Sequence, residues 1–306
     1  MIVSASYRSD IPAFYGVWFR QRLAEGTVWV ANPYGGRPYE VSLRAPACDG
    51  LVFWTRNLAP FRAALAEVAG YDLPFAVQYT ITGYPRALEA SVTDAEHSIA
   101  QMRWLAETYG PRVAVWRYDP VLLTSLTPPA WHRETFARLA EALSGATDEV
   151  VLSFAQIYAK TRTNLERAAG RHGFTWTDPT DGEKQALLGD LAEIAAGQGL
   201  TATLCSQPDL PVSGLVPARC IDAQRLSDIA GRPIAAKTKG NRPGCLCAES
   251  RDIGAYDTCP HGCTYCYAVR RPELAKRNHK AHDPAAPMLY PVARAAAETP
   301  IKSEHP

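Results

Sequence analysis

Three cysteines near the end of the chain are spaced so that their sulfurs could surround one metal centre. Cys259, Cys263 and Cys266 (the triad) lie in the segment CPHGCTYC, with three and then two residues between them. On one short turn, all three thiols can point the same way. Thiolates are soft ligands that select iron–sulfur clusters, zinc or copper(I). A cubane cluster has four irons, so three cysteines leave one iron open to another ligand.

The spacing, with the aromatic Tyr265 directly before the third cysteine, resembles the cluster motif of radical S-adenosylmethionine (SAM) enzymes. The resemblance implies that the triad binds a [4Fe–4S] cluster and that SAM binds its open iron, with Tyr265 beside the cofactor. It also implies that a reductant such as flavodoxin or ferredoxin supplies the electron that cleaves SAM to a 5′-deoxyadenosyl radical. Most members carry the motif after their first strand, whereas here it follows the last predicted strand. A zinc knuckle that takes a fourth cysteine from nearby is the alternative.

Four more cysteines lie N-terminal to the triad, at Cys205, Cys220, Cys245 and Cys247. Four thiols are the number that a second [4Fe–4S] cluster or a structural zinc ion needs. These four are therefore candidates for a second metal centre, with an iron–sulfur cluster ahead of zinc. Alternatively, the first two are ordinary buried cysteines, which are common in protein cores. We interpret Cys48, in an early loop, as structural.

The composition is that of an ordinary globular protein. The 306 residues can bury a full core, and 47% of them are hydrophobic against 21% charged. No apolar run approaches the ~20 residues that span a bilayer, and the first residues lack the basic start and apolar stretch of a signal peptide. We therefore expect a cytoplasmic protein without a membrane partner. In that reducing compartment, seven cysteines crowded between positions 205 and 266 indicate metal binding and not disulfides.

Charge is balanced overall but not along the chain. The formal net charge is +1, yet residues 232–280 hold ten Lys or Arg against four Asp or Glu, a local excess of six positive charges. This basic patch could bind nucleic acid. A solvated tail, particularly over residues 270–280, is the simpler interpretation of the same pattern.

Short β-branched or aromatic runs alternate with longer amphipathic runs, which is typical of parallel βα units. The predicted strands cover residues 2–6, 50–55, 75–82, 112–118, 150–154 and 201–205. The predicted helices cover residues 12–25, 59–69, 93–109, 129–143, 160–169, 183–198 and 221–230. Residues 27–31 and 39–43 form an additional predicted hairpin.

Six βα units are too few for a closed eight-stranded barrel. We predict an α/β fold, specifically an open, partial TIM-like (β/α)6 barrel over residues 1–207. Right-handed connections would place the carboxyl ends of all strands on one rim, where barrels of this type hold their active sites. A cysteine-rich cap over residues 208–268 would fold across that rim and bring the triad to it. Residues 269–306 are expected to form a basic, flexible tail.

Polar side chains gather at the predicted carboxyl ends of otherwise apolar strands, a placement that is costly unless they serve a ligand or each other. The cofactor-binding candidates are Ser6, Gln78, Thr80, Arg117 and Asp119, together with Tyr265. Arg117 and Asp119 could instead simply pair with one another. No residue is identified as catalytic.

Several sequence blocks together resemble the uncharacterised DUF1848 family. The blocks cover residues 4–15, 52–57, 79–84, 116–120 and 252–268, so the resemblance extends over nearly the whole chain to about residue 268. That family has a C-terminal cysteine cluster similar to the radical SAM one, and its substrate is not established. The resemblance therefore implies the cluster and the barrel but no particular reaction. The Gly-Gly-Glu motif with which the radical SAM superfamily binds SAM is not found in this sequence.

Three hypotheses about function follow. The first is a radical SAM enzyme that abstracts hydrogen from an unknown substrate in the barrel mouth, where the protein orients the reactants and excludes water. A variant of it is a nucleic-acid repair enzyme of the lyase type, which docks through the basic cap and stacks a base on Tyr7, Trp54 or Tyr84. Packing in the core explains these three aromatic residues equally well. The third is a non-catalytic module whose cysteines hold zinc and whose cap serves a partner.

Overall fold

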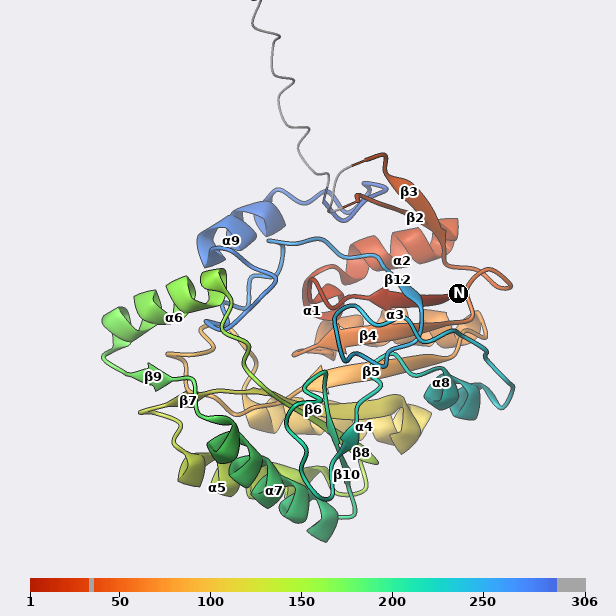
Figure 1. Cartoon of the computed structure of the whole chain (residues 1–306). Helices are drawn as coiled ribbons and strands as arrows, with labels where there is room; N and C mark the ends of the chain where they lie inside the picture. Colours follow the sequence, from red (N-terminus) through yellow and green to blue (C-terminus); the bar gives the residue numbers. More distant parts are fainter. Residues whose placement is uncertain (33–35, 291–306) are drawn as a thin grey trace, which may run out of the picture.

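The central element is a parallel β-sheet. The computed structural model describes residues 1–32 and 36–290 of the chain, and in these ranges the main sheet has eight strands in the order β11-β10-β8-β6-β5-β4-β1-β12 (Figure 1). Every neighbouring pair is parallel. The strands are β1 (Ile2–Ala5), β4 (Gly50–Thr55), β5 (Phe75–Thr80), β6 (Ala114–Val121), β8 (Glu149–Phe154), β10 (Thr201–Leu204), β11 (Val216–Pro217) and β12 (Ser250–Asp252).

Helices follow most of these strands. They are α1 (Ile11–Phe14), α2 (Gly16–Glu25), α3 (Arg62–Gly70), α4 (Ala95–Tyr109), α5 (Pro129–Leu143), α6 (Ala159–His172), α7 (Asp181–Gly197), α8 (Ala223–Ala230) and α9 (Pro272–Lys280), with short 3-10 turns η1 (Ala59–Phe61) and η2 (Pro111–Val113). Two antiparallel pairs lie outside the main sheet: β2 (Thr27–Val30) with β3 (Tyr39–Ser42), and β7 (Leu123–Thr124) with β9 (Trp176–Thr177). The predicted strands, helices and first hairpin are thus confirmed, although the predicted helix 12–25 is interrupted at Tyr15.

The predicted α/β class is confirmed, and the sheet is wound in one direction. The six strands β1, β4, β5, β6, β8 and β10 lie side by side in their sequence order. Each connection between two consecutive strands of this set contains at least one helix. The carboxyl ends of these strands therefore share one rim. Within the described residues the sheet does not close into a barrel, because β11 and β12 form two separate edges.

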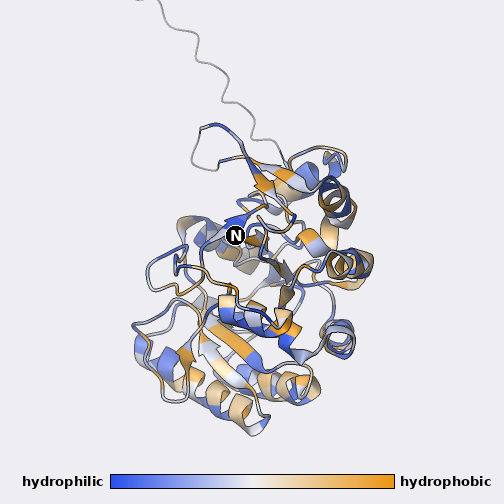
Figure 2. Ribbon diagram, turned by 90° about the vertical axis from the view of Figure 1, so that its right-hand side faces the viewer, coloured by the Kyte–Doolittle hydropathy of each residue, from blue (hydrophilic) through white to orange (hydrophobic). Residues whose placement is uncertain are grey.

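The two faces of the sheet pack against different parts of the chain. Leu51 and Phe53 of β4 belong to a core shared with α3, α4, α5 and α7, whereas Val52 packs with buried residues of the segment that follows β10. This follows from strand geometry, because successive side chains point to opposite faces. Figure 2 shows hydrophobic and hydrophilic residues alternating along the helices that flank the sheet. In Figure 1 the segment after β10, coloured teal to light blue, crosses the inner face of the sheet.

The chain after β10 is part of the same body as the sheet. Its two short strands extend the sheet at opposite edges, since β11 pairs with β10 and β12 pairs with β1. Helix α9 packs against the first helices: the rings of His279 and Tyr15 lie 5.3 Å apart, and Trp18 Nε1 donates to Ala286 O at 2.9 Å. Residues 269–290 therefore fold, which differs from the flexible tail that we expected from residue 269. The rest of that tail, residues 291–306, lies outside the described residues.

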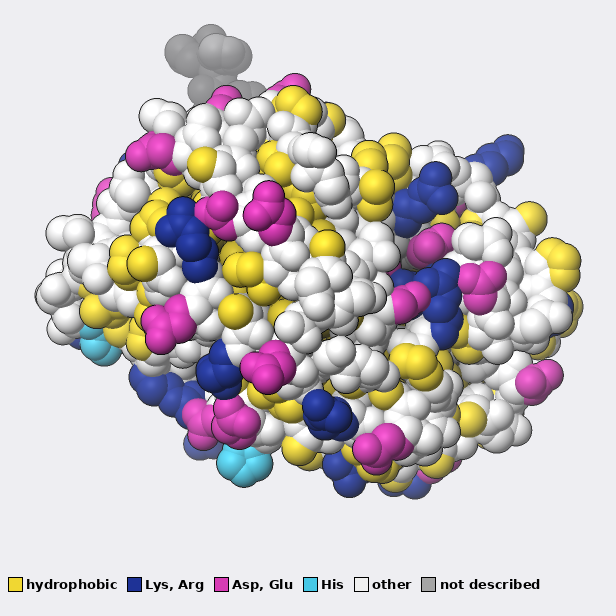
Figure 3. All heavy atoms as spheres, turned by 90° about the horizontal axis from the view of Figure 1, so that it is seen from below, with side chains coloured by type: hydrophobic (Ala, Val, Ile, Leu, Met, Phe, Trp, Pro, Cys, Tyr) yellow, Lys and Arg dark blue, Asp and Glu magenta, His cyan; other side chains and the backbone are white. Residues whose placement is uncertain are grey.

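No helix in the described ranges is long and apolar enough to cross a membrane. The face of the molecule seen from below in Figure 1 carries acidic and basic side chains interspersed with hydrophobic ones (Figure 3). Ion pairs join neighbouring helices, such as that between Arg133 Nε of α5 and Asp190 Oδ2 of α7 at 2.6 Å. A face of mixed charge does not attract a polyanion over its whole area.

One buried histidine couples the stability of the fold to pH. His132 of α5 is fully buried; its Nδ1 lies 2.8 Å from the hydroxyl of Tyr118, and its Nε2 lies 3.1 Å from Leu122 O. Burial lowers the pKa of His132 from 6.5 to about 4. Because the folded state binds this proton more weakly than the unfolded chain, the neutral imidazole stabilises the fold above pH 6.5. That contribution is lost as the pH falls from about 6.5 towards 4.

We predict that the wild type loses about 3 kcal/mol of unfolding free energy over this interval through His132 alone. The variant His132→Gln, which is neutral at every pH, should not show that loss. Urea unfolding at a series of pH values measures both proteins, and the stability gap between them should narrow as the pH falls. A gap that stays constant from pH 7 to pH 4 would contradict the prediction.

Candidate functional site

The triad lies at the carboxyl rim of the sheet. Its loop follows β12 and is tied to the loop that follows β5: Cys263 forms an antiparallel bridge with Glu89, Thr264 N donates to Leu88 O at 3.0 Å, and Ser91 N donates to His261 O at 2.9 Å. Strand β5 is the third of the six strands in sequence. The pairing of β12 with β1 therefore delivers the last cysteines of the chain to the first half of the rim.

A buried carboxylate anchors this loop to the beginning of the chain. Asp10 Oδ1 accepts hydrogen bonds from Ala13 N at 2.9 Å and Thr55 Oγ1 at 2.8 Å. Its Oδ2 accepts from Arg56 N at 2.8 Å and lies 2.8 Å from His261 Nε2. The same side chain therefore caps α1, holds the end of β4 and positions the triad loop.

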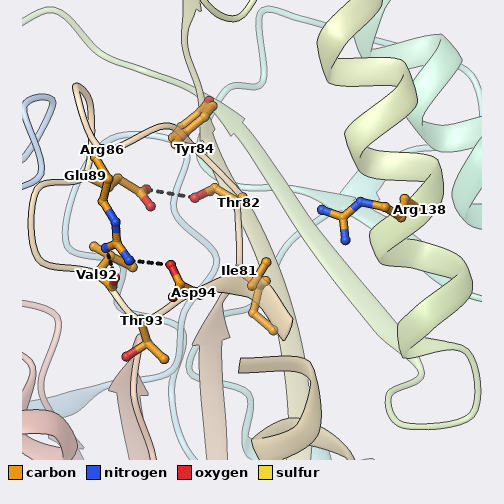
Figure 4. A pocket seen from close by; sticks show the side chains of 11 residues that line it. Ile81, Thr82, Tyr84, Arg86, Glu89, Val92, Thr93, Asp94 and Arg138 are labelled. Atoms are coloured by element: carbon orange, nitrogen blue, oxygen red, sulfur yellow. Dashed lines mark hydrogen bonds and ion pairs between the residues drawn. The ribbon is translucent and has the colours of Figure 1, made fainter. Parts of the chain in front are cut away.

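A second polar group lies on the other side of the triad loop. Glu89 Oε1 accepts from Arg56 Nη1 at 2.7 Å and from Thr82 Oγ1 at 2.8 Å, and the hydroxyl of Tyr265 also donates to it. Arg56 Nη2 donates to the Tyr265 hydroxyl at 2.6 Å. Figure 4 shows Glu89 and Thr82 pointing toward one another beside a cavity of about 110 Å³. The hydroxyl of Tyr265, which we expected beside a cofactor, is thus occupied by these two partners.

The three thiols of the triad interact electrostatically without touching. Each of the three cysteines is partly exposed, and each senses at least one other thiol of the triad or a nearby cation. Burial raises the pKa of Cys263 to about 12, although the Arg56 guanidinium opposes the shift. Burial also raises the pKa of Cys259 and of Cys266, and Ala268 N donates to Cys266 Sγ at 3.3 Å. Among the described residues, no hydrogen bond joins one sulfur of the triad to another.

Ser6 belongs to a third polar group, centred on the last residue of β12. The carboxylate of Asp252 accepts from Ser6 Oγ at 2.7 Å, Ser4 Oγ at 2.9 Å, Tyr7 N at 3.0 Å and Gly254 N at 2.9 Å. A Cβ on Gly254 would lie 2.0 Å from Ser6 Oγ, so only glycine allows this approach. The group joins the ends of β1 and β12 beneath the triad loop.

The other four cysteines (the four-cysteine group) come together on the inner face of the sheet. The sulfurs of Cys205 and Cys220 lie 3.5 Å apart. The thiol of Cys247 lies within hydrogen-bonding range of those of Cys220 and Cys245, so the four thiols form a continuous chain of contacts. Three of these residues are buried and Cys245 is partly exposed.

Two predicted cofactor-binding residues contact this group and not the triad. Arg117 Nη1 donates to Cys220 Sγ at 3.0 Å and to Gln78 Oε1 at 2.9 Å, while Gln78 Nε2 donates to Cys220 O at 2.8 Å. Arg117 also forms the ion pair with Asp119 that the sequence suggested, with Nε 2.9 Å from Oδ1. Thr80 lies opposite Arg117 in the register of β5 and β6. A role of these four residues toward a cofactor stays a prediction.

In the described ranges, no group of three or more His, Cys, Asp or Glu side chains is arranged so that it could hold a metal ion. Asp10 and Arg56 belong to the polar residues that follow the predicted strands, whereas nothing in the sequence pointed to the roles of Glu89 and Asp252 at the rim. Three of the resemblance blocks contain three of these residues, since Asp10 lies within 4–15, Arg56 lies within 52–57 and Asp252 begins 252–268. The sequence did not indicate the roles of these residues, because each role depends on partners far along the chain.

Cations and aromatic rings alternate around the rim. The guanidinium of Arg8 lies 5.4 Å from the ring centroids of both Tyr7 and Tyr256, and Lys160 Nζ lies 5.6 Å from the latter ring. Arg117 lies 5.0 Å from the ring of Trp54. Tyr256 is exposed at this rim, so its ring can contact a ligand.

Tyr84, the third aromatic residue named as a possible stacking partner for a base, lies beside the triad loop, with its ring 5.8 Å from that of Tyr265. It is buried, its hydroxyl donates to Pro120 O at 2.9 Å, and its ring stacks on Trp131 at 5.6 Å. Its ring therefore packs in the core around the loop after β5, which is the alternative that the sequence left open for these aromatic residues.

Comparison with known families gives one match. A family model described as a domain of unknown function (DUF1848) matches residues 2–268, which include the sheet, both groups of cysteines and the rim. No curated protein matches the chain.

We predict that Asp10→Ala destabilises the protein by about 2–4 kcal/mol, because the buried donors of Thr55, Arg56 and His261 lose their acceptor. The triad loop should also loosen, so its thiols should react faster with a thiol reagent under native conditions. Asp49→Ala is the matched control, since that carboxylate is exposed and pairs only with the N-terminal amine among the described residues. Equal stability and equal thiol reactivity in the two variants would contradict the anchoring role.

Proposed function

The chain belongs to the DUF1848 family, whose description names no reaction, and on that premise we propose that it is a radical SAM enzyme. In this proposal the triad holds a [4Fe–4S] cluster, SAM binds beside it, and an unknown substrate occupies the carboxyl rim of the sheet. When bound, the cluster and SAM together supply a 5′-deoxyadenosyl radical that abstracts hydrogen from the substrate.

The observation that carries the proposal is that the triad has three thiols at the rim and, among the residues that the structure describes, no available fourth ligand. All eight cysteines lie within the described residues, and four of the other five contact one another. Cys48 lies at the start of β4, where its thiol donates to Gly50 O at 3.6 Å. His261 cannot serve instead, because Asp10 and Ser91 O occupy its two nitrogens. A structural zinc site would require four ligands, whereas a cluster with an open iron requires three.

The surroundings of the triad also suit an anionic cluster. Arg56 lies near Cys263 and Cys266, and Lys160 lies near Cys266, so positive charge faces two of the three sulfurs. The hydrogen bond that Ala268 N donates to Cys266 Sγ also stabilises a negatively charged sulfur. The acidic neighbours Asp10 and Glu89 are held by their own donors and are not free to ligate the metal.

The finer architecture fits this placement. We interpret the singly wound strands as an open, partial TIM-like barrel over residues 1–207, with residues 208–268 as its cap. In such barrels the carboxyl rim holds the active site. Ser6, Thr80 and Asp119 lie at or near this rim and are the remaining candidates to orient SAM, since no Gly-Gly-Glu motif is present. A small redox protein such as flavodoxin or ferredoxin would deliver the electron.

The test is the iron content of the protein, purified and reconstituted anaerobically. The variant with Cys259→Ala, Cys263→Ala and Cys266→Ala should lose about four irons per chain relative to wild type, along with all reductive cleavage of SAM. Cys48→Ala should keep both. An unchanged iron content in the triple variant, or zinc at the triad in place of iron, would overturn the proposal and leave the non-catalytic zinc module as the better one.

The alternation of cations and rings around the rim favours a second candidate, in which the substrate is nucleic acid. Rings stack on bases and cations neutralise phosphates, so their combination suits a single strand or an extruded base. Tyr256 is exposed and lies beside both Arg8 and Lys160. In this candidate function, the ring of Tyr256 takes the stacking role that we had considered for Tyr84.

We predict that Tyr256→Ala weakens the binding of a single-stranded oligonucleotide by roughly tenfold, which corresponds to the loss of one stacked base. The exposed Tyr71, which is remote from the rim, provides the matched control Tyr71→Ala. Fluorescence anisotropy at two salt concentrations measures both variants, and wild-type binding should weaken as the salt rises. Wild-type protein that does not bind the oligonucleotide, or equal affinities in the two variants, excludes this candidate.

A further inference from the structure

We propose that the four-cysteine group, Cys205, Cys220, Cys245 and Cys247, binds a single zinc ion that fixes the C-terminal segment on the inner face of the sheet. This site is separate from the triad, and it does not depend on the proposed function.

The spacing of the sulfurs indicates a single ion and not a second cluster. Tetrahedral zinc with bonds of ~2.3 Å brings its sulfur ligands to within ~4 Å of one another, whereas the ligands of a cubane lie up to ~7 Å apart. The Cys205 and Cys220 sulfurs are already 3.5 Å apart, and Cys247 lies within hydrogen-bonding range of both Cys220 and Cys245. The triad shows no such contact. The structure therefore reverses our preference for iron–sulfur at this second centre.

The charges around the group fit a thiolate centre. A zinc ion with four thiolates carries two net negative charges, and two guanidiniums point at the sulfurs. Arg117 Nη1 lies 3.0 Å from Cys220 Sγ, and Arg242 Nη2 lies 3.5 Å from Cys205 Sγ. Guanidinium groups can only donate, so the two sulfurs must act as acceptors, which suits a thiolate better than a thiol.

The ligands come from three segments that a metal would join. Cys205 directly follows β10, Cys220 precedes α8, and Cys245 and Cys247 lie in the stretch between α8 and β12. Apart from the short β11 and α8, residues 205–249 form no regular structure in the described chain. The backbone already brings the segments together, since Ala248 N donates to Ile221 O at 2.8 Å and Gln78 holds the carbonyl of Cys220. A bound ion would stabilise this arrangement where secondary structure does not.

In the present structure each of these sulfurs contacts the next in a row, and the four do not surround one point. This agrees with the finding that no group in the described residues could hold a metal ion. Closing the chain requires the two end members, Cys205 and Cys245, to turn toward the middle pair. Cysteine has a single side-chain torsion between Cα and its sulfur, so we expect this turn to occur by a change of rotamer. Partial exposure of Cys245 gives an ion access from solvent.

The test is the metal content of the full-length protein, measured for zinc and iron separately after purification from zinc-supplemented cells. Wild type should contain about one zinc ion per chain in addition to any iron. Cys220→Ser combined with Cys247→Ser should lose the zinc. The triple alanine variant of the triad should keep the zinc while it loses iron, so failure of the proposed function would leave this result unchanged.

A second measurement guards against a variant that fails to fold. Wild-type apoprotein titrated with cobalt(II) should develop the visible absorption of a tetrahedral cobalt–thiolate site, and added zinc should abolish it. The variant Cys48→Ser, which changes a cysteine outside both groups, should behave as wild type. The absence of that spectrum together with zinc-free wild-type protein would overturn the proposal. It would equally be overturned if the double serine variant lost iron instead of zinc, or if wild type showed two fewer titratable thiols because of a disulfide.

Discussion

The organisation of the rim depends on the buried carboxylate of Asp10. A buried charge is costly unless donors surround it, and the donors of this one come from α1, the end of β4 and the triad loop. Its contact with His261 joins residues 251 positions apart. A cysteine motif at the far end of the chain is in this way held against the loop that follows the first strand.

The chain after β10 completes the fold and carries both groups of cysteines. An open parallel sheet must cover both faces, and helices that follow the strands cover only one. The inner face is covered by the chain after β10, which packs its cysteines and apolar residues against Val52, Ala76 and Val115. Polar residues of the inner face then serve this segment, as Gln78 and Arg117 do at Cys220. The segment that completes the fold is therefore the same one that forms the candidate sites.

The two groups of cysteines lie in different physical settings. The triad is partly exposed at the rim, and its sulfurs are held apart by the loop that carries them. The four-cysteine group is mostly buried, its sulfurs touch, and two guanidiniums face it. Three exposed thiols leave room for a further ligand, whereas four buried thiols are typical of a structural site, and this difference is the basis for the different roles that we propose for the two groups.

The sequence by itself determined the local features of this protein. Strands such as β4 and helices such as α5 were predicted to within a few residues, because side-chain periodicity and turn residues act over short distances. The softness of the thiolates is likewise a property of the residue type. Only the tertiary structure decided the partners: Asp10 with His261, Arg117 with Cys220, Tyr84 in the core, and α9 packed against Tyr15. These contacts join positions far apart in the chain, and the path that brings them together is set by the packing of the whole sheet, which no local pattern records.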